Sequence, residues 1–137
     1  MRRGLVGALG LILLMSCGGD SVSPTNPNNV SLAGTYTLRT INSSGLPYAI
    51  QSSGTTVQIT GDQVTVADGG SFSETTSYKV VATGASQVGS STGTWARAGS
   101  TITFTFLTGG SGVITGSGDG TNLTLVLGAL GTWVYTK

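Results

Sequence analysis

The chain has 137 residues, with 6 basic and 5 acidic side chains, a formal net charge of +1, no histidine and 1 cysteine. This length predicts one folded domain, and the charge leaves no basic surface for nucleic acid. Histidine is the commonest general base and metal ligand, and a single cysteine forms neither an internal disulfide nor a zinc cluster. We therefore expect no enzyme activity, no catalytic residue, no metal or other cofactor, and no nucleic-acid partner.

Residues 1–16 have the pattern of a secretory signal peptide. Arg2 and Arg3 form a short positive segment, residues 5–15 (LVGALGLILLM) are apolar or glycine, and Ser16 precedes the only cysteine. A helix over this apolar segment would rise about 16 Å, which is too short for the ~30 Å hydrocarbon core of a membrane. The pattern therefore predicts export followed by removal of residues 1–16.

Residues 14–17 (Leu-Met-Ser-Cys) resemble the lipobox of bacterial lipoproteins. The resemblance implies a thioether-linked diacylglycerol on Cys17, cleavage before Cys17, and acylation of the new amino terminus with a fatty acid such as palmitate. Several acyl chains, at ~0.8 kcal/mol per buried CH₂, make membrane attachment effectively permanent. An ordinary signal peptide with a coincidental cysteine, or a buried core helix, is the alternative interpretation.

The predicted location is the cell envelope, with membrane lipid as the partner of acylated Cys17. Gram-negative lipoproteins with an Asp after the cysteine resemble those kept at the inner membrane, so Gly18 favours the outer membrane if the organism is Gram-negative. Residues 17–30, which are rich in Gly, Ser, Asn and Pro, predict a tether with a reach of at most roughly 40 Å. A folded domain is expected over residues 31–137.

Short segments rich in Thr, Val, Ile, Leu and aromatic residues alternate with Gly, Ser and Asp after residue 30, which predicts strands without helices. The predicted strands are 34–41, 55–60, 63–67, 72–81, 93–97, 101–107, 112–116, 122–127 and 131–136, with a further one near 47–51. Pairs of small residues that favour tight turns separate them, at 61–62, 68–69, 98–99, 109–110 and 119–120.

The fold class predicted from this spacing is all-β, a single antiparallel up-and-down barrel of about eight or nine strands. Short hairpins favour a barrel, whereas a β-sandwich, the alternative, requires longer crossovers. Closure would also pair the uncharged, strand-prone segments 101–107 and 122–127. We expect residues 34–40 to pair with residues 131–136 and to close the barrel.

Residues 34–36 (Gly-Thr-Tyr) resemble the opening Gly-x-Trp of lipocalins, and the Gly-Thr-aromatic triplet recurs at residues 93–95 and 131–133. The chain is similar to the small lipocalin-like (calycin-type) domains of bacterial lipoproteins. The resemblance implies that Tyr36 closes one end of the barrel and that a basic residue after the last strand, here Lys137, packs over it. The chain lacks the Thr-Asp-Tyr element, the disulfide and the carboxy-terminal helix of lipocalins.

Residues 89–93 (GSSTG) match the serine-hydrolase pattern G-x-S-x-G, but a strand is expected to follow and no histidine is present to activate Ser91. We interpret this segment as a loop.

Candidate ligand-binding residues are those expected to point into the barrel. Alternation along residues 72–81 places Glu74 on the same face as Tyr78, so the Glu74 carboxylate would face inward and require a partner, unless it reaches water near a strand end. Tyr36, Trp95 and Trp133 are the expected walls. An eight-stranded barrel encloses room either for its own side chains or for one small ligand.

Two functions are therefore predicted. The first is a membrane-anchored lipoprotein whose barrel binds a small hydrophobic ligand. The alternative is a solid barrel that acts as a structural, interaction or inhibitor module on another envelope protein, without a small-molecule ligand.

Overall fold

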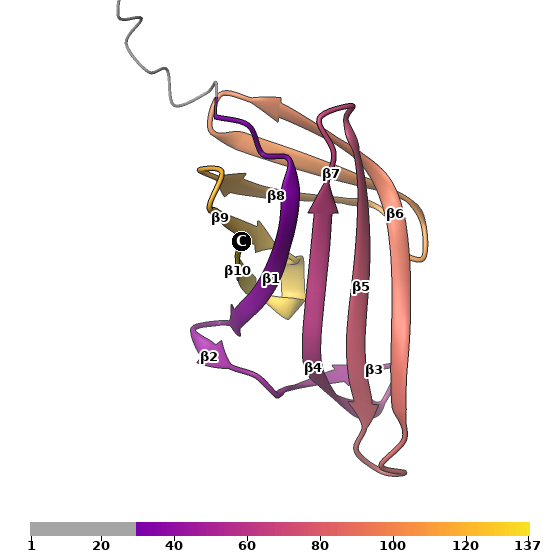
Figure 1. The fold of residues 1–137 in the computed structure, drawn as a ribbon. Helices are drawn as coiled ribbons and strands as arrows, with labels where there is room; N and C mark the ends of the chain where they lie inside the picture. The colour runs from indigo at the N-terminus through magenta and orange to yellow at the C-terminus, as the bar shows by residue number, and fades with distance from the viewer. Residues whose placement is uncertain (1–29) are drawn as a thin grey trace, which may run out of the picture.

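The computed structural model describes residues 30–137, so the predicted signal peptide, Cys17 and nearly all of the predicted tether lie outside the described residues. The chain forms a closed antiparallel barrel of 8 strands with two extra strands. Figure 1 shows their arrangement. The elements are β1 (Gly34–Ile41), β2 (Ser44–Gly45), β3 (Tyr48–Ser52), β4 (Thr55–Val66), β5 (Ser71–Val80), β6 (Ser86–Ala98), β7 (Thr101–Thr108), β8 (Val113–Gly118), β9 (Asn122–Val126), a 3-10 helix (Gly128–Leu130) and β10 (Thr132–Thr136). The predicted all-β barrel is confirmed, and the alternative sandwich is wrong.

The barrel closes through β1, which pairs with two strands. The carboxy-terminal half of β1 pairs with β10, with Leu38 opposite Tyr135 and Ile41 opposite Trp133. The amino-terminal half pairs with β4. The predicted pairing of the first and last strands is therefore confirmed. β2 and β3 lie where β1 and β4 diverge, each hydrogen-bonded to one of them.

Two predicted strands, 55–60 and 63–67, are one strand in the structure. β4 runs through residues 61–62 without turning, and its register against β5 shifts between Ile59 and Gly61. This β-bulge adds one residue and reverses the alternation, so that Ile59 and Asp62 both lie on the buried face. The predicted turn at 61–62 is wrong because β5 offers a continuous partner on both sides of the bulge.

The predicted strand 93–97 begins earlier in the structure than expected, because the residues before it are also in a β-strand. β6 begins at Ser86 and pairs with β5 from Ser86 to Thr94. The loop assigned to residues 89–93 is therefore wrong. Glycine and serine are weak strand formers on their own, and here the long partner strand provides the backbone hydrogen bonds. The turn glycines Gly99 and Gly120 adopt positive φ values of 62° and 88°, as tight hairpins require.

We call the end of the barrel where β1 begins the upper end (Figure 1). Tyr36 is fully buried there, and its hydroxyl donates a hydrogen bond to the Leu32 carbonyl at 2.8 Å. The Lys137 ammonium lies 5.1 Å from the centroid of the Tyr36 ring, so the expected contact between these residues is present. The Arg97 guanidinium donates to carbonyls of Val30 and Gly118 and ties the incoming chain to β8.

The core fills the middle and upper barrel with large side chains. Phe72 contacts Phe104 and Phe106 edge to face, at centroid distances of 5.0 Å and 5.2 Å. Such pairs contribute about 0.5–1.5 kcal/mol beyond the area they bury. The buried cluster comprises Leu32, Tyr36, Leu38, Ile41, Ile59, Val64, Val66, Phe72, Ile102, Phe104, Leu123, Leu125, Trp133 and Tyr135.

Candidate functional site

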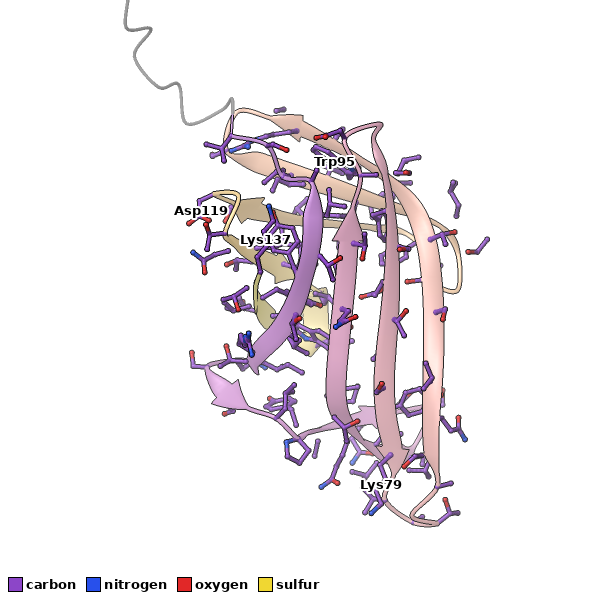
Figure 2. The ribbon with its side chains drawn as sticks, in the orientation of Figure 1. Lys79, Trp95, Asp119 and Lys137 are labelled. Atoms are coloured by element: carbon purple, nitrogen blue, oxygen red, sulfur yellow. The ribbon has the colours of Figure 1, made fainter. Side chains whose placement is uncertain are left out.

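Water reaches part of the inner wall of the barrel along β5 and β6. On the inward face of β5, Phe72 is buried, whereas Glu74, Thr76 and Tyr78 are half-buried. The glycine opposite Thr76, Gly89 on β6, is also half-buried. Inward residues of β10 and β9 remain buried along the whole strand. The inner wall formed by β5 and β6 is therefore less covered toward the lower end, where the β5–β6 hairpin projects and Lys79 is labelled in Figure 2.

Asp62 lies inside the barrel because of the bulge in β4. Its side chain is 3% exposed, and the Thr76 hydroxyl donates a hydrogen bond to Oδ2 at 3.0 Å. The other carboxylate oxygen, Oδ1, is buried without a hydrogen-bond partner. A buried charge without full compensation is costly, so this position is chemically unusual for a barrel core.

Glu74 stands on the neighbouring strand, opposite Val64 of β4 and Ser91 of β6. The Ser91 hydroxyl, itself 5% exposed, donates a hydrogen bond to Oε2 of Glu74. Because Asp62 pairs with Thr76, two residues further along β5, the two carboxylates are diagonal neighbours on one face of the sheet. We call Asp62 and Glu74 the acidic pair.

The Asp62 carboxyl group keeps its proton near neutral pH, because its pKa is raised. Burial first, and the negative charge of Glu74 second, raise the pKa of Asp62 from 3.8 to about 8, although the Thr76 hydrogen bond acts in the opposite direction. A side-chain hydrogen bond with Glu74 raises this pKa further. Two carboxylates this close in a water-poor site cannot both ionise easily.

Tyr135 brings a third polar group to the acidic pair from β10, which is separated from β4 by β1 alone. It lies on β10 between Leu38 and Leu123, is fully buried, and its hydroxyl has no hydrogen-bond partner. Burial raises the Tyr135 pKa well above 10, and the charges of Asp62 and Glu74 raise it further. The hydroxyl therefore lies within the field of both carboxylates and carries its proton at all physiological pH values.

The candidate residues chosen from sequence are distributed over the barrel. Glu74 faces inward in the middle of β5, as alternation predicted, and Tyr78 lies on the same face nearer the lower end, donating to Gln87 at 2.8 Å. Tyr36 and Trp133 are 0% and 3% exposed and belong to the packed core. Trp95 is half-buried at the upper end, where its indole N–H donates to the Ala67 carbonyl at 2.8 Å.

The structure thus groups Glu74 and Tyr78 and leaves the other three aromatic residues elsewhere. Sequence reasoning missed Asp62, which was assigned to a turn, and did not distinguish Tyr135 from the other aromatic residues. The sequence did contain one indication of these two residues. Tyr135 and Asp62 both carry polar groups within segments whose other residues follow the pattern of a buried core. Alternation alone could not find Asp62, since the bulge changes its face.

Residues 30–137 also line three hollows, with volumes of about 340, 440 and 350 Å³. The first lies at the upper end, beside Arg97 and Asp119, and the third at the lower end, between Tyr48 and Leu130. The acidic pair lines none of the three.

Comparison of the chain with protein-family models, with curated proteins and with solved structures finds no match in any of the three.

Between residues 30 and 137 there is no group of three or more acidic, histidine or cysteine side chains suited to hold a metal ion. Nor does that part of the chain contain a helix with the length and apolar character to cross a membrane. The class that the fold and site define is a small closed antiparallel β-barrel with a polar cluster inside it.

Proposed function

We propose that the protein is a lipid-anchored lipoprotein of the cell envelope whose lipocalin-like barrel binds a small, largely hydrophobic ligand. The observation that carries this proposal is the acidic pair with the unpartnered Tyr135 hydroxyl inside the barrel. The ligand enters from the lower end past Tyr78, and its polar group lies beside Glu74. Tyr36 and Trp95 support the closed upper end, and Trp133 forms part of the buried wall.

The energetic argument compares this interior with that of a solid barrel. Replacing buried ionic groups by apolar residues of similar size is often neutral or stabilising, by ~1–4 kcal/mol. A barrel with a purely structural role gains nothing from Asp62 and Tyr135 at these positions. A binding barrel does, because polar groups without partners inside an apolar site fix the orientation of a ligand.

The membrane anchor in this proposal is the acylated Cys17, with membrane lipid as its partner and the outer membrane as its site if the organism is Gram-negative. Changing Cys17→Ala removes the thiol that carries the diacylglycerol. We expect the variant to leave the membrane fraction on cell fractionation, and its retention there would contradict the proposed anchor.

Ligand binding is tested by obstructing the path along β6. A Cβ at Gly89 would lie 3.9 Å from Tyr78 Cε1, an ordinary contact, so Gly89→Leu adds a side chain over the inner wall without backbone strain. Gly69→Leu is the matched control, because a Cβ there meets nothing within 4 Å. The readout is native mass spectrometry of the full chain extracted from its own membranes.

The expected result is a co-purifying small molecule on the unmodified chain and on Gly69→Leu, and its loss from Gly89→Leu. An unmodified chain that carries no small molecule, or equal loading of all three proteins, would contradict ligand binding in the barrel.

A second candidate function, the interaction module, is favoured by apolar side chains on the outer face of β7 and β8. Leu107 and Val113 are 68% and 59% exposed there. Cross-linking in intact envelopes tests this candidate. A specific protein adduct that is lost in Leu107→Ser and kept in Gly89→Leu would favour it over ligand binding.

A further inference from the structure

The acidic pair has no positive partner among the described residues. The basic side chains of residues 30–137 are Arg39, Lys79, Arg97 and Lys137. Arg97 and Lys137 lie at the upper end, against Val30 and Tyr36 respectively. Arg39 is exposed and donates to the Thr136 hydroxyl, and Lys79 is exposed on the outward side of β5. No positive charge contributes to the shift of the Asp62 pKa.

The polar groups around the pair are arranged as acceptors for one more donor. Thr76 and Ser91 each already donate to one carboxylate oxygen, at Asp62 Oδ2 and Glu74 Oε2. This leaves Asp62 Oδ1 and the Tyr135 hydroxyl, both buried without a hydrogen-bond partner. An ammonium group has three N–H donors, whereas a hydroxyl has one and a carboxylate has none.

We propose that the ligand class is an organic amine, bound as its ammonium ion between Asp62, Glu74 and Tyr135, with its apolar body along the inner wall beside Tyr78. This inference rests on the proposed function. An anionic ligand is excluded by repulsion from the pair. Calcium fits poorly because it takes 6–8 oxygen ligands, and the described residues offer two carboxylates here.

Binding of the ammonium ion displaces the proton that Asp62 carries near neutral pH. The titratable groups around Asp62 are Glu74 from β5 and Tyr135 from β10. Burial and the negative charge of Glu74 raise the pKa of Asp62 to about 8. An alkyl amine itself titrates near the lysine value of about 10.4, so it remains protonated between pH 6 and 8. Amine binding therefore becomes tighter as the pH rises through this range, approaching about tenfold per pH unit.

The experiment titrates the full chain in detergent micelles with probes that share one body and differ in their head group. The probes are 2-phenylethylamine, 2-phenylethanol and 3-phenylpropanoate, with calcium chloride as a separate probe, and the dissociation constants are measured by calorimetry at pH 6 and pH 8. We expect the amine to bind at least about tenfold more tightly than the alcohol at pH 8. The carboxylate and calcium should bind more weakly than either.

Variants then assign the head group to the acidic pair. Glu74→Gln and Asp62→Asn keep the size of each side chain and remove its charge, and each should weaken amine binding by more than about tenfold while 2-phenylethanol affinity changes little. Asp68→Asn is the control, because Asp68 is exposed and accepts a hydrogen bond from Ser31 outside the barrel.

Several results would overturn the amine assignment while leaving the ligand-binding barrel intact. These are an alcohol that binds as tightly as the amine, a calcium affinity above that of the amine, an amine affinity that is equal at pH 6 and pH 8, or full amine binding by Glu74→Gln. Failure of all probes, on a chain that also carries no native ligand, would overturn both this inference and the proposed function.

Discussion

Tyr36 at the upper end and Tyr135 beside the acidic pair occupy equally buried positions and differ in how their hydroxyl groups are satisfied. The Tyr36 hydroxyl donates to the Leu32 carbonyl, and the Lys137 ammonium covers its ring. The Tyr135 hydroxyl has no partner and faces two carboxylates. Both residues are 0% exposed, so burial does not separate the two regions.

The two regions differ in how completely their buried polar groups are paired. Buried polar groups in folded proteins almost always have hydrogen-bond partners, and each missing partner costs about 1–3 kcal/mol. The upper end meets this rule through local contacts between the first strand, the chain before it and Lys137. The interior behind β5 departs from it at Asp62 and Tyr135, and polar binding groups are expected at such a departure.

The largest expected effect is a pH dependence of stability that originates at Asp62. Its folded pKa, about 8, lies above the ordinary value of 3.8, so folding takes up a proton between these values. The free energy of unfolding therefore falls as the pH rises from about 4 to about 8, by at most ~6 kcal/mol at ~1.4 kcal/mol per pKa unit. Chemical denaturation at pH 5 and pH 8 measures this loss.

Asp62→Asn should remove most of that slope, because its amide mimics the neutral carboxyl at every pH. Asp68→Asn, which changes an exposed carboxylate near the upper end, should keep it. If the free energy of unfolding of the unmodified chain stayed constant or rose between pH 4 and pH 8, Asp62 would not have a raised pKa, and the proposed difference between the two regions would be wrong.

A smaller effect on stability is expected from alanine substitutions at two glycines of β6, Gly93 in the packed core and Gly89 on the inner wall. A Cβ at Gly93 would overlap the carbonyl oxygen of Thr105 and lie 2.5 Å from Phe72 Cε1, whereas a Cβ at Gly89 has room. Gly93→Ala should destabilise by about 1–3 kcal/mol through overpacking, and Gly89→Ala should change stability by less than about 0.5 kcal/mol. Thermal unfolding of both variants checks this, and equal stabilities would mean that the inner wall is packed uniformly.

The smallest expected effect on stability comes from removing one hydroxyl group, by a Tyr-to-Phe substitution, at each of two positions. Tyr135→Phe removes a buried hydroxyl without a partner and should raise the free energy of unfolding by about 1 kcal/mol. Tyr36→Phe leaves the Leu32 carbonyl without its donor and should lower it by about the same amount. Urea denaturation at pH 7 measures both, and two shifts of the same sign would show that the Tyr135 hydroxyl has a partner in solution.

Much of the fold could be predicted from the sequence because strands and turns are encoded locally. Alternation of apolar residues marked β7 and β9, and glycines at the hairpin turns marked their ends. The pairing of β1 with β10 and the packing of Lys137 over Tyr36 could also be predicted, since a closed meander brings its two ends together. The full length of β6 could not, because residues 86–92 form a strand only beside β5.

The candidate site was predictable only in part. Glu74 follows from period-2 alternation on a regular strand, which is a property of a few neighbouring residues. Asp62 depends on a bulge, and a bulge is set by how two whole strands align. Tyr135 has the same local pattern as other inward aromatic residues, and only the side chains across the barrel make its hydroxyl different.

The sequence by itself therefore determined the strand type, the order of hairpins and the inward direction of Glu74, because these follow from backbone geometry over short distances. The tertiary structure decided that Asp62 joins Glu74, that Ser91 and Thr76 each donate to one of them, and that Tyr135 faces both without a partner. These contacts join β4, β5, β6 and β10, and their energies depend on burial, which exists only once the barrel is closed.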